Sequence, residues 1–309
     1  MSGSWKSNAS WGPLSVPDGW IWQDIGNYYG AGASLLNWRE NQYDLVLKSG
    51  HTVGDPVTIV GTVPVNLFGL TFLNKLTSGE TGSGDNAYIY LAPGSSKGYI
   101  LGTIPINEDH FKVSGSYPDP ARSLINELNE KLAVRSDSLL KEKTTPFIFY
   151  AHLSPPLDSI NYWFLKKSIN LYGEALVKTL GYKMTNSGTT DSGVSVIRNF
   201  WKRNGIEPSA LKILDGSGLS PGNRVTTRSL VSILKYAAGK NWFPSFFYAL
   251  PEINGIKMKD GYIGGVRSYT GYIKDRQGIK YLFSFIVNNF DGSPATVREK
   301  MWKVLDILK

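Results

Sequence analysis

The chain has 309 residues, 41% of them hydrophobic, which is enough for one large domain or several small ones with a substantial core. It contains no cysteine, and this excludes disulfide bonds, thiol catalysis and thiolate metal sites. Thirty-three Lys and Arg against 25 Asp and Glu give a net charge of +8. The basic residues are spread along the chain, which favours a solvated surface, although an anionic partner such as a cell-wall polymer or a nucleic acid also suits this charge.

His51, His110 and His152 are far apart and share no ligand spacing, so we expect no metal site and no cofactor. No apolar run approaches the ~20 residues that a membrane helix requires. The first residues, MSGSWKSNAS, lack the apolar core of a signal peptide and resemble an engineered start or the stump of a longer chain.

The first half of the chain is predicted to be rich in short strands. Residues 1–50 are rich in Gly, Trp and Tyr and end in a predicted strand, QYDLVLKSG. Residues 51–146 carry short β-branched and aromatic runs separated by Gly, Pro and Asn, which is typical of a small β-rich module. This module includes one amphipathic helix, predicted over Asp119–Leu132 with Asp119 as its cap.

Residues 147–309 are predicted to form an α+β domain, because helices precede an antiparallel sheet and one closing helix. After a first strand, FIFYAHL, four helices have start and stop signals. They are expected from Ser154, with Pro155 in the first helical position; from Asn170 to Gly181; from Asp191 or Ser192 to Gly205; and over TRSLVSILKYAAG. Two strands, YIGGVRSYTGYI and KYLFSFIVNNF, are expected to join through the turn KDRQG, and a last helix to cover ATVREKMWKVLDILK.

A Ser-x-Asn triplet lies where two predicted helices meet. Ser168 and Asn170 would point to different sides of a continuous helix, but in a turn between two helices both can face one cleft. Alone, the pattern favours an ordinary helix junction, with Asn170 as an N-cap and Ser168 as a polar turn residue.

The stretch LDGSGLSPGNRVTTRSL is predicted to be a long shaped loop. Asp215 and Ser217 can hydrogen-bond its backbone, and Thr226 or Thr227 can cap the helix that follows. Such loops are often connectors only, but long ordered loops also carry binding sites.

The stretch IKMKDGYIGG places Lys259 two residues before Gly261 at the beginning of a strand. A Gly at this position lets a ligand approach the backbone closely. By itself the pattern favours an edge strand with protective charges.

Taken together, these motifs resemble the D-alanyl-D-alanine carboxypeptidase/endopeptidase family of penicillin-binding proteins, peptidase family S13. The resemblance rests on SPPLDSINYWFLKKSINLYGEALVKTLG, then LDGSGLSPGNRVT, then KDGYIGGVRSYTGYI with FIVNN. The segments VPDGWIWQDIGNYYGAGASLLNWRENQYDL and YPDPARSLINELNEKL resemble that family's inserted region.

The resemblance covers nearly the whole chain and implies an α+β fold. It implies a transpeptidase domain of the penicillin-binding-protein/β-lactamase type, an antiparallel sheet with helices, plus a small β-rich inserted module. Residues 1–50 would be a Gly/aromatic-rich segment of the inserted region, 51–146 the module with one helix, and 147–309 the C-terminal part of the catalytic domain.

The chemistry implied by the resemblance is acyl transfer. A Ser in a Ser-x-x-Lys motif attacks the peptide bond between two D-alanines of a peptidoglycan stem, and the acyl-enzyme is then hydrolysed. Ser168 would relay protons near the leaving amine, Asn170 would hydrogen-bond the substrate backbone, and Lys259 would attract the terminal carboxylate. Gly261 would let the substrate lie against the strand, and the N–H of Tyr262 would be one oxyanion donor. The further substrate-binding residues implied are Asp260, Asp215, Gly216 and Ser217.

The nucleophile has no clear position in this sequence. In the family its motif precedes the inserted region, in an N-terminal part that the resemblance does not find here. Two Ser-x-x-Lys matches occur, Ser138 with Lys141 in a polar stretch and Ser232 with Lys235 on a late helix, and neither has the family's position. Because such a pattern arises by chance in a chain rich in Ser and Lys, we expect neither serine to be the nucleophile.

Asp260 stands where the family has the hydroxyl of Thr or Ser. An ionised carboxylate cannot donate a hydrogen bond to the substrate carboxylate. Two like charges ~4 Å apart repel by about 1 kcal/mol in water and about 4 kcal/mol at an effective dielectric of 20. We therefore expect Asp260 to weaken substrate binding, or to pair with Lys259 or Lys257.

Three hypotheses follow. The first is an active serine-type carboxypeptidase of the cell envelope or periplasm that acts on peptidoglycan stem peptides and reacts with β-lactams, with no nucleic-acid partner. The second is an inactive relative that binds wall peptide or a protein partner, and the third is a structural fragment without a ligand. Without the family's N-terminal strands, KYLFSFIVNN would expose an apolar sheet edge, which predicts self-association or coverage by another segment.

Overall fold

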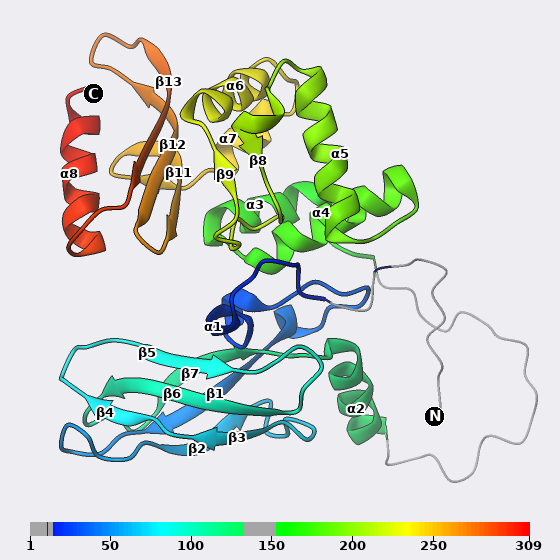
Figure 1. The fold of residues 1–309 in the computed structure, drawn as a ribbon, viewed down its shortest axis with the longest axis vertical. Helices are drawn as coiled ribbons and strands as arrows, with labels where there is room; N and C mark the ends of the chain where they lie inside the picture. Colours follow the sequence, from blue (N-terminus) through cyan, green and yellow to red (C-terminus); the bar gives the residue numbers. More distant parts are fainter. Residues whose placement is uncertain (1–10, 12–14, 133–152) are drawn as a thin grey trace, which may run out of the picture. The chain divides into compact units, whose positions relative to one another are not determined.

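The structure, a computed structural model, describes residue 11, residues 15–132 and residues 153–309. The chain divides into two units, Met1–Pro155 and Pro156–Lys309 (Figure 1). The predicted boundary between residues 146 and 147, the predicted strand FIFYAHL apart from its last residue, and the Ser138–Lys141 match all lie outside the described residues. None of the helices within the described ranges has the length and apolarity needed to cross a bilayer.

Two small sheets build the first unit. In one, strand β1 lies between β2 and β7, antiparallel to both. In the other, β6 pairs in parallel with β3 and β4 and antiparallel with β5. The elements are α1 (Trp22–Ile25), β1 (Gln42–Lys48), β2 (Thr58–Val63), β3 (Thr71–Asn74), β4 (Thr77–Gly79), β5 (Asn86–Tyr90), β6 (Lys97–Pro105), β7 (Phe111–Ser116) and α2 (Pro120–Leu132), with short 3-10 turns at Tyr28–Gly30 and Arg39–Asn41.

The core of the first unit follows from the alternation of β1. Tyr43, Leu45 and Leu47 are buried, whereas the residues between them are half-buried, as expected when successive side chains point to opposite faces. They pack with Ile89 of β5 and Ile100 of β6. The strand predicted at QYDLVLKSG is confirmed as β1, and the β-rich character predicted for the residues after it is confirmed by β2 to β7.

The second unit combines a helical cluster with an antiparallel sheet and one closing helix. The strand order in the sheet is β10-β11-β12-β13, and a separate short pair joins β8 to β9. Thr226 accepts a hydrogen bond from the N–H of Ser229 and caps α6, as predicted. The elements are α3 (Leu157–Lys167), α4 (Asn170–Thr185), α5 (Thr190–Arg203), a 3-10 turn at Pro208–Ala210, β8 (Leu211–Lys212), β9 (Arg224–Val225), α6 (Thr227–Ala238), α7 (Phe243–Ala249), β10 (Glu252–Ile253), β11 (Ile256–Ile263), β12 (Val266–Lys274), β13 (Lys280–Asn288) and α8 (Pro294–Asp306).

Helices cover both faces of this sheet (Figure 1). On one face, Met258 of β11 and Tyr269 of β12 are fully buried and pack with Met301 of α8. On the other face, the hydroxyl of Tyr272 donates to the carbonyl of Leu234 in α6, and its ring lies against aromatic residues of α7. Because side chains alternate along β11, Lys257 and Lys259 point to this second face, towards the helical cluster.

One prediction about the sheet is wrong, and one helix was not predicted. The stretch YIGGVRSYTGYI is not one strand, because Gly264 and Gly265 form a two-residue turn that pairs Ile263 with Val266. Gly265 has φ +73, which glycine adopts at no steric cost. Helix α7 was also missed, because its sequence FPSFFYA is short, almost wholly apolar and without a polar face.

Three helix ends also differ from prediction. Helix α3 begins at Leu157, not at Pro155, because a residue before a proline is disfavoured in the helical region, and Pro155 precedes Pro156. Helix α4 continues past Gly181 to Thr185. Helix α5 is capped by Thr189, whose hydroxyl accepts from the N–H of Ser192.

Strand β13 lies at one edge of the sheet, and among the described residues only β12 pairs with it. Its Phe283, Phe285 and Val287 pack against the core shared with α8. The edge expected from the sequence is therefore present, and the predicted self-association through it stays a prediction.

Candidate functional site

The Ser-x-Asn triplet lies at the break predicted between two helices. Ser168 follows α3 with φ 56 and ψ 43, in the left-handed region, and Ile169 is extended before α4 begins at Asn170. A non-glycine residue in this region is uncommon and costs on the order of 1 kcal/mol. In one continuous helix, Ser168 and Asn170 would point to different sides, but the break removes this restriction. Ser168 is exposed and Asn170 is half-buried.

The end of α3 meets the beginning of β11 at one carbonyl oxygen. The ammonium groups of Lys166 and Lys257 lie 3.2 and 3.3 Å from the carbonyl oxygen of Leu250 and donate to it. Lys166 is two residues before Ser168, and Lys257 is two residues before Lys259. The structure therefore brings together two chain positions that each lie two residues before a predicted motif, and it forms a basic corner that favours an anionic ligand.

The outer edge of β11 is open beyond this corner. The N–H of Met258 donates to the carbonyl of Pro251, 3.1 Å away, on the side opposite β12. Since hydrogen-bonding direction alternates in an antiparallel strand, the N–H groups of Asp260 and Tyr262 point to the same outer side. Strand β10 pairs only with Ile256 and Lys257, so within the described residues no strand occupies the edge at Tyr262.

The floor of this edge is made by small and polar residues. Gly261 lies opposite Ser268, whose Oγ would be 2.7 Å from a Cβ added at Gly261. In the next row Lys259 lies opposite Thr270, and the hydroxyls of Thr270 and Ser284 are 2.9 Å apart. A backbone approached this closely leaves little room for a side chain at residue 261.

Asp260 pairs with basic residues, as the sequence predicted. Its Oδ1 is 3.4 Å from the ammonium of Lys259, and its Oδ2 is 3.7 Å from the guanidinium of Arg267. Arg267 in turn donates to the hydroxyl of Tyr269. Asp260 alternates with Lys259 along the strand, so its side chain starts from the face of α8. The carboxylate reduces the positive charge of Lys259 and is itself held by two cations.

The loop that carries DGSG is organised by a buried carboxylate. Asp215 is 4% exposed, its Oδ1 accepts from the N–H of Gly218 at 2.7 Å, and its Oδ2 accepts from the N–H of Ser220 at 2.6 Å. The Oγ of Ser217 accepts from the N–H of Leu219. The predicted bonding of Asp215 and Ser217 to the loop backbone is confirmed, whereas their role in substrate binding stays a prediction.

Two buried charged residues of α4 were not predicted as candidate site residues. Glu174 and Lys178 have exposed fractions of 0% and 2%. The Oε1 of Glu174 accepts from the N–H groups of Gly216 and Ser217, both at 2.9 Å. The signal was available, because in NLYGEALVK a Glu and a Lys follow Asn170 at intervals of four on the face that also carries the apolar residues.

Burial shifts the pKa values of both groups. It raises the pKa of Glu174 to about 7, and the charge of Asp215 adds to this, while hydrogen bonds from the hydroxyl and N–H of Ser217 and the N–H of Gly216 act against it. Burial lowers the pKa of Lys178 to about 8, against the attraction of Glu174. Burial therefore disfavours the charged form of both groups, and one of them, Glu174, contacts the loop directly.

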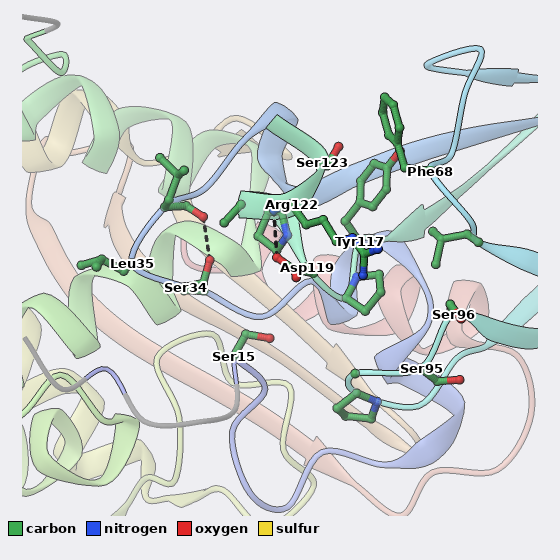
Figure 2. Close-up of a pocket in the computed structure, with 18 of the residues that line it drawn as sticks. Ser15, Ser34, Leu35, Phe68, Ser95, Ser96, Tyr117, Asp119, Arg122 and Ser123 are labelled. Atoms are coloured by element: carbon green, nitrogen blue, oxygen red, sulfur yellow. Dashed lines mark hydrogen bonds between the residues drawn. The ribbon is translucent and has the colours of Figure 1, made fainter. Parts of the chain in front are cut away.

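The first unit holds a separate cavity of about 720 Å³. Figure 2 shows Asp119 and Arg122, at the beginning of α2, together with Ser95 and Ser96 and the ring of Tyr117. The carboxylate of Asp119 accepts from the N–H of Arg122 at 2.9 Å, which confirms Asp119 as the helix cap. None of the residues predicted for the site lines this cavity.

Among the described residues, no group of His, Asp and Glu side chains has an arrangement that could hold a metal ion. The predicted catalytic residues Ser168, Asn170 and Lys259 all lie in the second unit, within or next to α3, α4 and β11. Ser232 and Lys235, the second Ser-x-x-Lys match, are exposed on α6.

Comparison with known proteins gives the chain a family. A model of the D-Ala-D-Ala carboxypeptidase 3 (S13) family matches residues 9–256. The chain is 26% identical over 253 residues to a D-alanyl-D-alanine carboxypeptidase of Actinomadura sp. (strain R39), covering 72% of this chain and 46% of that enzyme. It spans less than two thirds of the length of the curated relatives that it matches.

Solved structures give the same answer for the fold. The chain is similar to the crystal structure of penicillin-binding protein 4 from Haemophilus influenzae, with a TM-score of 0.73 at 18% identity over 94% of this chain and 73% of that one. A crystal structure of the same Haemophilus protein complexed with a novel β-lactam has a TM-score of 0.67 at 18% identity, over 89% of this chain and 70% of that one. The predicted fold class, an α+β fold of the penicillin-binding-protein type, is confirmed.

Proposed function

Because the chain belongs to the D-Ala-D-Ala carboxypeptidase 3 (S13) family, we propose that it forms the substrate-binding wall of a serine-type D-Ala-D-Ala carboxypeptidase or endopeptidase. The substrate is a peptidoglycan stem peptide that ends in D-Ala-D-Ala. The observation that carries the proposal is the shared acceptor of Lys166 and Lys257, the carbonyl oxygen of Leu250, which brings the end of α3 close to the beginning of β11.

The open edge of β11 provides the peptide site. An extended peptide can add to a free strand edge through main-chain hydrogen bonds. The outward N–H of Tyr262 then donates to the carbonyl oxygen of the scissile bond and stabilises the negative charge that forms there during attack. In this binding mode the absence of a side chain at Gly261 lets the substrate backbone approach the strand closely.

The basic side chains orient the substrate. The ammonium of Lys259 attracts the terminal carboxylate, which distinguishes the C-terminal residue from the rest of a peptide. Asn170 hydrogen-bonds the substrate backbone, and the hydroxyl of Ser168 passes a proton to the leaving amine. The left-handed conformation of Ser168 supports this role, because strained residues concentrate at functional sites.

The reaction needs a serine nucleophile, and we assign this role to none of the described residues. In the proposed mechanism its oxygen attacks the carbonyl between the two D-alanines, the second D-alanine leaves as the amine with the proton relayed by Ser168, and water hydrolyses the acyl-enzyme. Ser138 lies outside the described residues. We assign the chain's own part of the mechanism to binding and proton relay.

Asp260 favours a second function, that of a relative that binds the peptide without turnover. Its ion pair with Lys259 removes part of the charge that would hold the substrate carboxylate. In this alternative the wall still recognises D-Ala-D-Ala, and the peptide leaves unchanged. Either way the family supports a location in the cell envelope, which includes the periplasm.

The experiment that tests the proposal is a calorimetric titration of the chain with N-acetyl-L-Lys-D-Ala-D-Ala. The matched control is the same peptide ending in L-Ala-L-Ala. We expect binding of the first peptide only. Equal binding of both peptides, or binding of neither, contradicts the proposal. Incubation with a labelled penicillin then separates the two functions, because covalent labelling requires a nucleophile and peptide binding does not.

A further inference from the structure

We propose that Glu174 is a positioning residue of this site, which holds the loop Asp215–Ser217 on α4, the helix that begins with Asn170. The role of Glu174 in catalysis rests on the proposed function. The contacts themselves lie within the second unit and hold whatever the substrate is.

The loop and the helix touch through two glycines. A Cβ added to Gly216 would lie 2.2 Å from the carbonyl oxygen of Gly173, and a Cβ added to Gly173 would lie 2.6 Å from the carbonyl oxygen of Gly216. Such distances are far inside van der Waals contact with backbone atoms, so neither position accepts a side chain without movement. The backbones of loop and helix are in direct contact at this point.

Glu174 fastens this contact. It is the residue after Gly173, it is fully buried, and its Oε1 accepts from two consecutive backbone N–H groups of the loop, Gly216 and Ser217. Hydrogen bonds to an ionised acceptor are shorter and stronger than bonds between neutral groups. A single carboxylate oxygen therefore fixes two residues of the DGSG loop.

The same residue connects the loop to the Ser-x-Asn motif. Asn170, Glu174 and Lys178 follow one another at intervals of four and so lie on one face of α4. Helical side chains lean towards the N-terminus, so the carboxylate of Glu174 extends in the direction of Asn170. Glu174 therefore holds the loop Asp215–Ser217 next to the first turn of α4, which contains Asn170.

Packing alone does not explain a carboxylate here. A glutamine or an apolar side chain would fill the space at a lower cost, because burying an ionised group without full hydrogen bonding is expensive. The Oε2 of Glu174 has no hydrogen-bond partner among the described residues. The charged groups that face Glu174 are Asp215 from the loop and Lys178 from its own helix. The charge at Glu174 therefore has a use other than filling the core.

The test is the amide spectrum of the whole chain labelled with ¹⁵N, recorded from pH 5.5 to pH 8.5. Because burial raises the pKa of Glu174 to about 7, the amide signals of Gly216 and Ser217 should move with a midpoint near neutral pH. In Glu174→Gln, which keeps the acceptor oxygen but not the charge, both signals should stop titrating. Signals that titrate unchanged in this variant overturn the proposal.

A binding measurement connects the loop to the site. We expect Glu174→Gln to weaken binding of N-acetyl-L-Lys-D-Ala-D-Ala by about fivefold to tenfold at pH 8 and by less than twofold at pH 5.5, where Glu174 is protonated. The matched control is Glu127→Gln, a buried glutamate of the first unit that pairs with Arg39, which should change affinity by less than twofold.

The two readouts separate the two proposals. Equal peptide affinity of Glu174→Gln and the unaltered chain at both pH values overturns a positioning role. Absence of peptide binding by the unaltered chain contradicts the proposed function instead, and the amide titration of Gly216 and Ser217 still decides whether Glu174 holds the loop.

Discussion

The carboxylate of Asp260 lies 3.4 Å from the ammonium of Lys259, the residue directly before it in β11. Both groups are partly exposed, at 36% and 27% of the side-chain surface, so solvent screens the pair and an incoming carboxylate can compete for Lys259. Arg267 approaches Asp260 from β12 and provides a second cation. Binding of a substrate carboxylate therefore depends on how strongly Asp260 pairs with Lys259 and Arg267.

Replacing Asp260 with Thr should tighten binding of a D-Ala-D-Ala peptide by about tenfold or more. The change removes the like charge, worth about 1–4 kcal/mol at ~4 Å, and adds a hydroxyl that can donate to the peptide carboxylate. Calorimetric titration at 50 mM and 500 mM salt measures the effect, which should shrink at high salt. Asp291→Asn, a change of an exposed acid in the same unit, is the control. Unchanged affinity in Asp260→Thr contradicts the electrostatic account.

Replacing Lys259 with Gln should abolish most of the peptide affinity, a loss of more than tenfold, because it removes the cation that meets the terminal carboxylate. A peptide amidated at its C-terminus should bind both proteins equally weakly. Lys274→Gln, at the exposed end of β12, serves as the charge-matched control and should behave like the unaltered chain. If Lys259→Gln and Lys274→Gln give the same affinity, Lys259 does not contact the carboxylate.

Replacing Gly216 with Ala should destabilise the second unit by about 2–3 kcal/mol, since the new methyl group meets a backbone oxygen that cannot rotate away. Gly264→Ala is the matched control, because a Cβ there has no neighbour within 4 Å among the described residues. Urea unfolding followed by tryptophan fluorescence measures both variants. Equal midpoints would show that the loop moves away from α4 easily.

The stability of the chain should depend on pH through Glu174. Its folded pKa is raised from 4.5 to about 7, so its contribution is fully present below pH 4.5 and is lost as the pH rises through 7. The free energy of unfolding, relative to Glu174→Gln, should fall by on the order of 2 kcal/mol between pH 5 and pH 7.5. Lys178 acts in a higher window: its lowered pKa gives stability above pH 10.5 that is lost as the pH falls through about 8. Urea unfolding at four pH values between 5 and 7.5 measures this change in both the unaltered chain and Glu174→Gln. If the free energy of unfolding depends on pH in the same way in both proteins, the prediction is contradicted.

Periodicity and capping residues were sufficient to predict most elements of the second unit. Thr226 caps α6 as predicted, because it combines a local hydrogen-bonding side chain with the apolar period that follows. Helix α4 begins at Asn170 as predicted, but Ile169 occupies the N-cap position without a side-chain bond, so the prediction of Asn170 as the N-cap is wrong. The hairpin at Gly264–Gly265 was missed because apolar residues on both sides of the turn gave one continuous pattern. A two-residue Gly-Gly turn was nevertheless a usable signal.

The site was predictable only as far as local motifs reach. The Ser168–Asn170 break follows from sequence, but the shared acceptor of Lys166 and Lys257 depends on Leu250, which lies 84 residues after Lys166. The period of α4 places Glu174 on the apolar face of the helix, but it does not indicate the partner, because Gly216 of the loop lies 42 residues further along the chain. Tertiary packing decides which charged residues become buried, and this information is absent from a single sequence.

The most direct measurement is the map of amide shift changes when N-acetyl-L-Lys-D-Ala-D-Ala is added to the ¹⁵N-labelled chain. The account predicts saturable changes at Tyr262 and Asp260, whose N–H groups face the open edge of β11, and at Asn170, with no changes when the peptide ends in L-Ala-L-Ala. Changes confined to other parts of the chain, or equal changes with both peptides, would contradict the assignment of this edge as the substrate-binding wall.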